Sequence, residues 1–193
     1  MDNTLEEHGT IAPGQPLLLR TVLRLLPPSS SGALRCVLET TGSAEGAPVF
    51  GCASTYLIRR GKRGSAKQSD AKTLPPWPPV AQWTLDAAAG RRYARLSGDW
   101  NPIHLTGGSA RLMGMRAPII HGMHTAASSC AALEGNSGKH TTRIACRFQA
   151  AVALGSTVSL YRKPGTDEFV VEAGGTRAVS GEWTVGNIYS PKI

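Results

Sequence analysis

The chain has 193 residues, of which 41% are hydrophobic and 18% charged, a composition typical of a globular protein and not of a disordered one. Its formal net charge of +8 would suit nucleic acid, an anionic membrane surface or a phosphorylated ligand such as a coenzyme A ester. The basic residues are scattered, however, and no zinc-finger spacing or aromatic-basic RNA motif occurs. We therefore expect no nucleic-acid partner, and we interpret the basic cluster at residues 59–63 as a solvated strand end.

The sequence also argues against a membrane or secreted protein. No apolar run is long enough to cross a bilayer, and residues 1–7 are acidic and lack the apolar stretch of a signal peptide. No CxxC pair occurs among the four cysteines, so reduced thiols in a cytoplasmic protein fit best. These cysteines are Cys36, Cys52, Cys130 and Cys146.

Three runs in the first third of the chain resemble β-strands: residues 17–26, 33–41 and 48–60. The first run could instead be a short helix, because leucine and arginine are good helix formers. Residues 61–79 are rich in lysine, serine and proline and show no periodicity, which predicts a linker or exposed crossover.

Helical segments are expected after this linker. Asp86 is a plausible N-cap for a helix over residues 87–96, with Tyr93 and Leu96 on one face. A second short helix is predicted over residues 108–115.

The remainder of the chain predicts one long helix followed by an antiparallel meander. Residues 122–133 are rich in small side chains, so this helix can lie close against a sheet. Strands are expected over residues 141–152, 157–162 and 168–185, the last broken at a pair of glycines. A long helix followed by antiparallel strands predicts an α+β fold.

Asp99 and His104 are the strongest catalytic candidates in the sequence. They lie five residues apart across the turn imposed by Asn101-Pro102, which can bring both side chains toward a common point and let them share a water or a proton. In the alternative interpretation, Asp99 caps a turn and His104 is a packed loop histidine.

A second candidate feature is the helix start at His121-Gly122-Met123. Backbone N–H groups at a helix start can stabilise negative charge that develops on a carbonyl oxygen, and Gly122 would let a substrate approach the backbone closely. An ordinary helix entry, with glycine for packing, is the alternative.

Other chemistry is poorly supported. A metal site of His104, His121 and His124 lacks both an HxxxH pattern and a matching carboxylate spacing, so no metal is expected. The glycine pairs do not form a phosphate-binding loop, and no GxSxG motif marks a serine nucleophile, so we expect no cofactor and no serine hydrolase.

Together these residues resemble the MaoC-like (R)-specific enoyl-CoA hydratase family, which has the hotdog fold, an antiparallel sheet wrapped around a central helix. The resemblance covers about residues 93–133 and includes Phe148 on a following strand. It is carried by Ser97-Gly98-Asp99-x-Asn101-Pro102-Ile103-His104 and by Pro118-Ile119-Ile120-His121-Gly122-Met123.

The resemblance implies reversible hydration of a trans-2-enoyl-CoA or other enoyl thioester to the (R)-3-hydroxyacyl product. Asp99 and His104 match the family positions that activate water, and Gly122 matches the backbone donor to the thioester oxygen. Asn101 is expected to shape the loop. The residues expected around the substrate are Gly122, His121, Met123, Asn101, Ser97 and Gly98.

The resemblance also implies a domain organisation. Residues 1–61 would form a partial, non-catalytic hotdog repeat, residues 62–79 a linker, and residues 80–193 the catalytic MaoC-like domain. With three strand runs and no central helix, the first repeat is short for a two-repeat member of the family. A second copy of the chain could complete it, so a homodimer is expected.

Two rival functions are weighed against hydration. A hotdog thioesterase would need a carboxylate in the middle of the central helix, where the sequence offers only Glu134 near the end. A non-catalytic module that binds acyl thioesters or pairs subunits would not need the Asp99–His104 pair. The sequence leaves open the acyl chain length and the choice between coenzyme A and acyl carrier protein.

Overall fold

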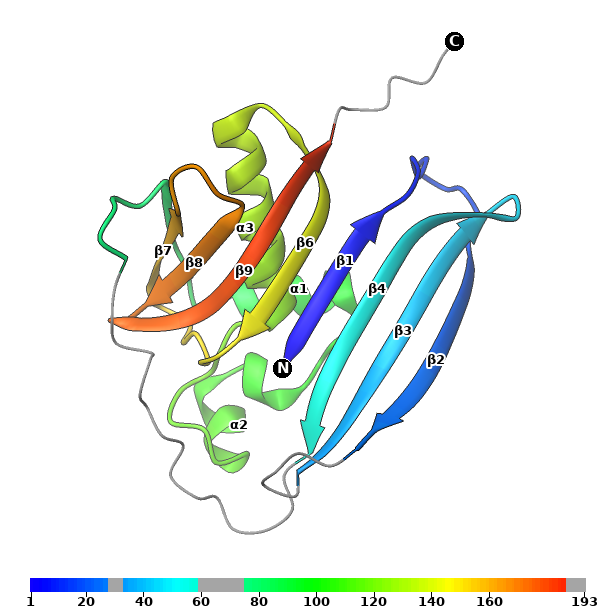
Figure 1. Ribbon diagram of the computed structural model, residues 1–193. Coiled ribbons are helices and arrows are strands. Elements are labelled where there is room, and N and C mark those ends of the chain that lie inside the picture. The colour runs from blue at the N-terminus through cyan, green and yellow to red at the C-terminus, as the bar shows by residue number, and fades with distance from the viewer. Residues whose placement is uncertain (28–32, 59–74, 187–193) are drawn as a thin grey trace. The chain divides into compact units, whose positions relative to one another are not determined.

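A computed structural model describes residues 1–27, 33–58 and 75–186 (Figure 1). Most of the predicted linker, residues 62–74, lies outside the described residues. The elements in chain order are β1 Asp2–Glu7, β2 Leu18–Leu26, β3 Leu34–Ala44, β4 Ala47–Ile58, β5 Ala81–Thr84, α1 Ala89–Ser97, the 3-10 helix η1 Pro102–His104, α2 Gly107–Leu112, α3 Gly122–Ser137, β6 His140–Phe148, β7 Thr157–Arg162, β8 Glu168–Ala173 and β9 Thr176–Gly186.

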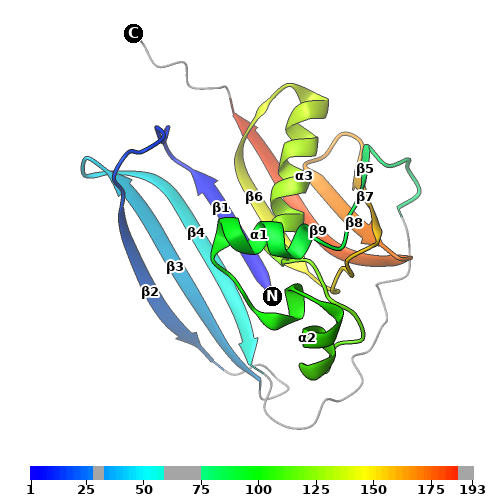
Figure 2. The same ribbon diagram turned by 180° about the vertical axis from the view of Figure 1, so that it is seen from behind.

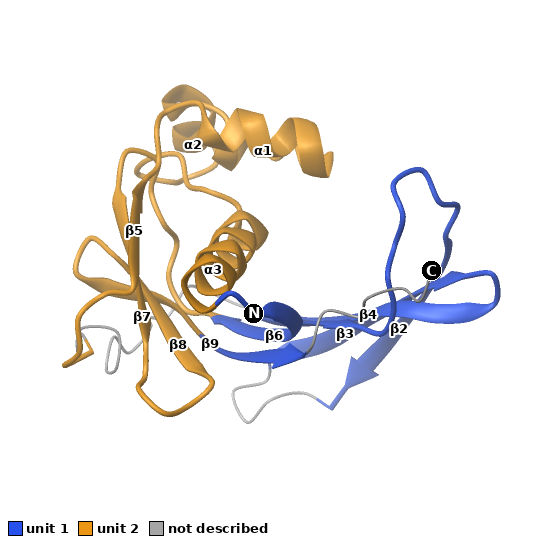
Figure 3. Ribbon diagram, turned by 90° about the horizontal axis from the view of Figure 1, so that it is seen from above, with its two compact units in different colours: residues 1–68, 138–147, 181–193 blue, residues 69–137, 148–180 orange. Residues whose placement is uncertain are grey.

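The chain divides into two compact units, coloured separately in Figure 3. The first comprises residues 1–68, 138–147 and 181–193, and the second comprises residues 69–137 and 148–180. The boundary therefore falls within β9. The expected partial amino-terminal hotdog repeat and its linker stay a prediction.

Antiparallel strands form the first unit, in the order β2-β3-β4-β1-β6. Four of these strands, β2, β3, β4 and β6, fall on predicted runs, although β6 ends at Phe148 and not at residue 152. β2 is a strand and not the alternative helix. The hairpin between β3 and β4 turns at Glu45-Gly46, where φ is 51° and 84°. A two-residue turn with both φ values positive matches the right-handed twist of the paired strands.

β1 was not predicted from the sequence, and the first third of the chain holds four strands and not three. Its acidic residues are poor strand formers, but they find partners on β6. Asp2 lies opposite Arg147 and Glu6 opposite Arg143, and each pair forms an ion pair, at 3.1 and 2.9 Å. Opposite charges facing each other across strands stabilise the pairing of β1 with β6.

In the second unit, the strand order is β9-β8-β7-β5. The helix α3 lies over the face of these strands, as the two opposite views show (Figures 1 and 2). This antiparallel sheet with one long helix confirms the predicted α+β class. β5 was not predicted, and it pairs with β7. The core is made of buried aliphatic and aromatic side chains, which include Leu133, Val158, Leu160, Phe169, Val171 and Val179.

The predicted start of α1 was wrong by two residues. The N-cap is Ala88, and Asp86 instead accepts a hydrogen bond from the Ala88 N–H and pairs with Arg92. The predicted apolar face was also wrong, because the Leu96 side chain is 83% exposed whereas Tyr93 is half-buried. The buried face of α1 consists of small residues, namely Ala89, Gly90 and Ala94.

Gly90 allows α1 to lie directly against the backbone of η1. A Cβ atom at this position would be 1.9 Å from the carbonyl oxygen of His104, far inside van der Waals contact. The absence of a side chain at Gly90 therefore sets how closely the helix approaches the loop that carries His104.

We expect Gly90→Ala to lower the free energy of unfolding by about 1–3 kcal/mol, the usual cost of overpacking, because backbone atoms must move to admit the methyl group. Urea denaturation would measure the change. Gly135→Ala is the matched control, since Gly135 also lies in a helix but a Cβ there meets nothing within 4 Å. The control should gain about 0.5–1 kcal/mol from reduced backbone entropy. Equal changes in the free energy of unfolding for Gly90→Ala and Gly135→Ala would contradict the argument that α1 packs directly against the backbone of η1.

Candidate active site

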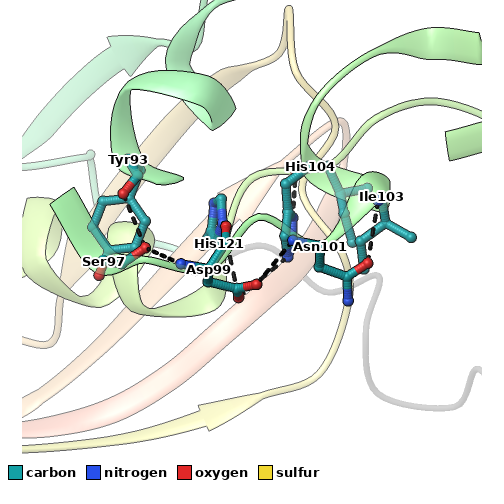
Figure 4. A network of polar contacts seen from close by, with 8 residues as sticks. Tyr93, Ser97, Asp99, Asn101, Ile103, His104 and His121 are labelled. Atoms are coloured by element: carbon teal, nitrogen blue, oxygen red, sulfur yellow. Dashed lines mark hydrogen bonds and ion pairs between the residues drawn. The ribbon is translucent and has the colours of Figure 1, made fainter. Parts of the chain in front are cut away.

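A sharp turn at the end of α1 directs Asp99 out of the helix (Figure 4). Gly98 takes a left-handed conformation with φ 74° and donates its N–H to the carbonyl of Ala94, which ends the helix. The Ser97 hydroxyl donates to the Tyr93 carbonyl and accepts the Asp99 N–H at 3.3 Å. The sequence-predicted residues Ser97 and Gly98 thus build the turn that precedes Asp99.

Asn101 shapes the loop, as expected. The Asp99 Oδ1 accepts the Asn101 N–H at 3.1 Å, and the Asn101 Oδ1 accepts the Ile103 N–H at 3.3 Å. Such side-chain bonds to an N–H two residues on replace backbone turns. Pro102 then opens the short helix η1, which ends at His104.

His104 is held in a single orientation by a bond to the backbone. Its side chain is buried, with the residue 8% exposed, and Nδ1 lies 2.9 Å from the carbonyl oxygen of Ile119. Because a carbonyl only accepts, Nδ1 must carry the proton, and Nε2 of the neutral ring then presents a lone pair. Burial lowers the pKa of His104 from its usual value of 6.5, against the opposing effects of the Ile119 bond and Asp99.

The structure brings Asp99 and His104 together. Asp99 Oδ2 lies 3.9 Å from His104 Nε2, and the Asp99 side chain is 53% exposed. This distance is too long for a direct hydrogen bond, but it lets one water molecule bond to both atoms. The pair can therefore hold a water between a carboxylate oxygen and an imidazole lone pair.

His121 belongs to the same network in a way that the sequence did not reveal. It is 4% exposed, and its Nε2 donates to the main-chain carbonyl of Asp99 at 2.9 Å. The His121 ring stacks on His104, with 3.7 Å between centroids and 25° between planes. No local pattern links residues 22 positions apart, so no signal in the sequence could have predicted this bond.

Tyr93 contacts two histidine rings, His121 and His124. Tyr93 lies 5.0 Å from His121 and 5.4 Å from His124, centroid to centroid. Burial raises the pKa of Tyr93, with a smaller contribution from Asp99, and burial lowers the pKa of His124. The sequence does not predict the contacts of Tyr93 with these two histidines, because they join α1 to residues at the start of α3.

Gly122 is the first residue of α3, where an N–H has no acceptor within the helix. A Cβ at Gly122 would lie 2.9 Å from the ring of Phe148 on β6, so glycine here makes room for that ring. Met123 follows on the same helix and is half-buried. The packing reason for glycine, raised above as the alternative, therefore holds for Gly122.

Asp99, His104 and His121 could together hold a metal ion, since one ligand atom from each lies within 4.8 Å of the others. The His121 Nε2, however, carries the proton that it donates to Asp99. Coordination through this atom would break that bond. The expectation that no metal is bound stays a prediction.

Comparison with known proteins identifies the family. A sequence model of the MaoC like domain matches residues 71–167, about half of the chain. The chain belongs to the MaoC-like domain family. The family resemblance seen in the motif around Asp99 and His104 is thereby confirmed.

Among the relatives of this MaoC-like chain is 3-hydroxyacyl-thioester dehydratase X of Mycobacterium tuberculosis, 40% identical over 88 residues, which are 46% of this chain and 31% of that protein. Peroxisomal multifunctional enzyme type 2 of Drosophila melanogaster is 30% identical over 145 residues, 67% of this chain and 24% of the other. The chain thus spans less than a third of the length of these relatives.

Solved structures share the fold over nearly the whole chain. The crystal structure of HtdX from Mycobacterium tuberculosis matches with a TM-score of 0.74 and 26% identity, and covers 97% of this chain and 75% of that one. A MaoC-like dehydratase from Phytophthora capsici matches with a TM-score of 0.76 and 21% identity over 97% of this chain and 71% of its own. The predicted MaoC-like hotdog fold is confirmed.

Within the described residues, no helix is both long enough and apolar enough to span a membrane.

The lowered pKa values predict how stability depends on pH. For His104 and His124, the folded state favours the neutral ring, so the unfolded state binds more protons below the usual pKa of 6.5. The free energy of unfolding should therefore be highest above pH 6.5 and fall as the pH drops through the folded-state values.

Urea denaturation from neutral pH down to about pH 5 would measure this fall. In the double variant His104→Gln/His124→Gln the free energy of unfolding should fall less over this pH range, because neither ring remains to be protonated. If the free energy of unfolding depended on pH in the same way in the wild type and the double variant, the assignment of this dependence to His104 and His124 would be contradicted.

Proposed function

We propose that this chain catalyses the reversible hydration of a trans-2-enoyl thioester to the (R)-3-hydroxyacyl thioester. The observation that carries the proposal is the pairing of the His104 Nε2 lone pair with the Asp99 carboxylate at 3.9 Å. Two acceptors at this separation suit a water molecule, which has two protons to donate.

His104 is the proposed proton carrier. Its lowered pKa keeps Nε2 unprotonated near neutral pH, as a general base requires. As the water oxygen bonds to the β-carbon, one water proton passes to Nε2 and the double-bond electrons move to the α-carbon and thioester oxygen. The imidazolium then returns a proton to the α-carbon, so one water is added and His104 regains its neutral form.

Asp99 is proposed to orient the same water through its second O–H. The carboxylate also stabilises the positive charge on His104 once the ring is protonated, because opposite charges at this distance attract. This division of roles follows from the tautomer that the Ile119 bond imposes on His104.

The N–H of Gly122 is proposed to stabilise the thioester oxygen. It lies at the amino-terminal end of the 16-residue helix α3, where the helix dipole favours negative charge. Preorganised donors of this kind stabilise an oxyanion that develops during the reaction.

The names of the relatives support acyl thioesters as the substrate class, since one is a 3-hydroxyacyl-thioester dehydratase. The net charge of +8 suits either the phosphates of coenzyme A or an acidic acyl carrier protein. A cytoplasmic location remains part of the proposal.

Thioester hydrolysis is disfavoured, because the only carboxylate on α3 is Glu134, close to the carboxyl end of the helix.

We expect Asp99→Asn and His104→Ala each to reduce hydration by about two orders of magnitude or more, because each removes one of the groups that act on water. The loss of ultraviolet absorbance of crotonyl-CoA and of a longer enoyl-CoA would follow the reaction, and chiral analysis would identify the (R) product. Asp167→Asn, an exposed carboxylate in the second unit, is the matched control and should retain the wild-type rate.

Near-normal rates in both dyad variants would refute the assignment of Asp99 and His104. Thiol release from the thioester without loss of the enoyl absorbance would identify a thioesterase. Saturable binding of the thioester with neither reaction, for both coenzyme A and carrier-protein substrates, would identify the non-catalytic module.

We also propose that the chain forms a homodimer. The edge strand β2 exposes leucines on both faces, with Leu25 80% exposed and Leu18 74% exposed. Exposed apolar strands at a sheet edge tend to be covered by another chain.

Light scattering should give a mass of two chains for the wild type. The variant Leu23→Lys/Leu25→Lys should have a lower mass. A monomeric mass for the wild type would contradict the proposal.

A further inference from the structure

We propose that His121 is a positioning residue for the Asp99–His104 pair, an inference that rests on the hydration reaction proposed above. The hydrogen bond from its ring fixes the main chain of Asp99. Its ring also stacks on the His104 ring and so restricts the orientation of that ring. It would thus set the distance between the carboxylate and the imidazole that share the water.

The main chain of Asp99 depends on His121 because it has few other anchors. Its N–H bond to the Ser97 hydroxyl is 3.3 Å long, whereas the bond from His121 Nε2 to its carbonyl is 2.9 Å. The Asp99 side chain is half-exposed and accepts the Asn101 N–H within the same loop. The bond from His121 therefore connects this exposed loop to a buried residue at the start of α3.

Both members of the pair are held by one short segment. Ile119 accepts the hydrogen bond from His104 Nδ1, and His121 donates to Asp99. This segment is itself fixed, because the Ile119 N–H bonds to Ile103 and the Ile120 N–H bonds to Val152. A displacement of residues 119–121 would move both catalytic groups, so the segment acts as a common support.

The ring contacts of His121 agree with this role. The groups that face His104 are Asp99, which favours its protonated form, and His121, whose charge would disfavour it. His121 also contacts the ring of Tyr93, which in turn contacts His124. His121 therefore packs against the His104 ring of the pair and against Tyr93 of α1.

Two variants separate the ring from the hydrogen bond. Glutamine can place an N–H donor near the position of Nε2, whereas phenylalanine keeps a flat ring and has no donor. We expect His121→Phe to lower kcat by about tenfold or more, the effect of losing a hydrogen bond to a group that must stay in place, with KM changed by less than about threefold. His121→Gln should recover most of kcat.

His124→Gln is the matched control. His124 is a neighbouring histidine that also contacts Tyr93, but its ring is not among the groups that bond to Asp99 or His104 in the described residues. It should keep the wild-type kcat. Equal losses in His121→Phe and His121→Gln, or an unchanged kcat in His121→Phe, would overturn the proposal.

A second readout does not depend on turnover. Amide hydrogen exchange of Asp99, Asn101 and Ile103 should accelerate several-fold in His121→Phe, and should stay near the wild-type rate in His121→Gln and His124→Gln. Unchanged exchange in His121→Phe would overturn the positioning role. If the wild-type protein did not hydrate any enoyl thioester, the proposed function would fail, while the exchange rates would still decide whether His121 holds the loop.

Discussion

The candidate site depends on the hydrogen bond from His104 Nδ1 to the carbonyl of Ile119. This bond fixes the tautomer, and the tautomer determines that the lone pair lies on Nε2, the atom nearest to Asp99. If the ring took the other tautomer, Nε2 would be a donor and could not accept a proton from water. The burial that lowers the pKa of His104 then keeps this lone pair available near neutral pH.

Two glycines allow the close packing of the backbone segments around this bond. At Gly90 the helix α1 meets the His104 carbonyl, and at Gly122 the helix α3 meets the ring of Phe148. A side chain at either position would displace one of the two segments that carry the pair. Close packing here therefore has a chemical consequence, because it sets the 3.9 Å separation between Asp99 and His104 across which one water can bond to both.

Local patterns predicted much of the fold, but contacts between distant residues could not be predicted. Alternating apolar residues indicated β3 and β4, and the Asn101-Pro102 turn brought Asp99 and His104 together as expected. β1 escaped prediction because its strand is stabilised by charges on β6, far along the chain. The bond between His121 and Asp99 and the contact of Gly90 with His104 likewise arise only once the helices are packed.

Every contact that defines the candidate site lies between residues of the second unit, which overlaps the matched MaoC-like region. The proposed chemistry therefore rests on a loop, a 3-10 turn and one helix start whose geometry is internal to that unit. The proposed dimer rests instead on exposed leucines of β2, in the first unit. Because the two proposals draw on separate groups of atoms, the loss of one would leave the physical argument for the other intact.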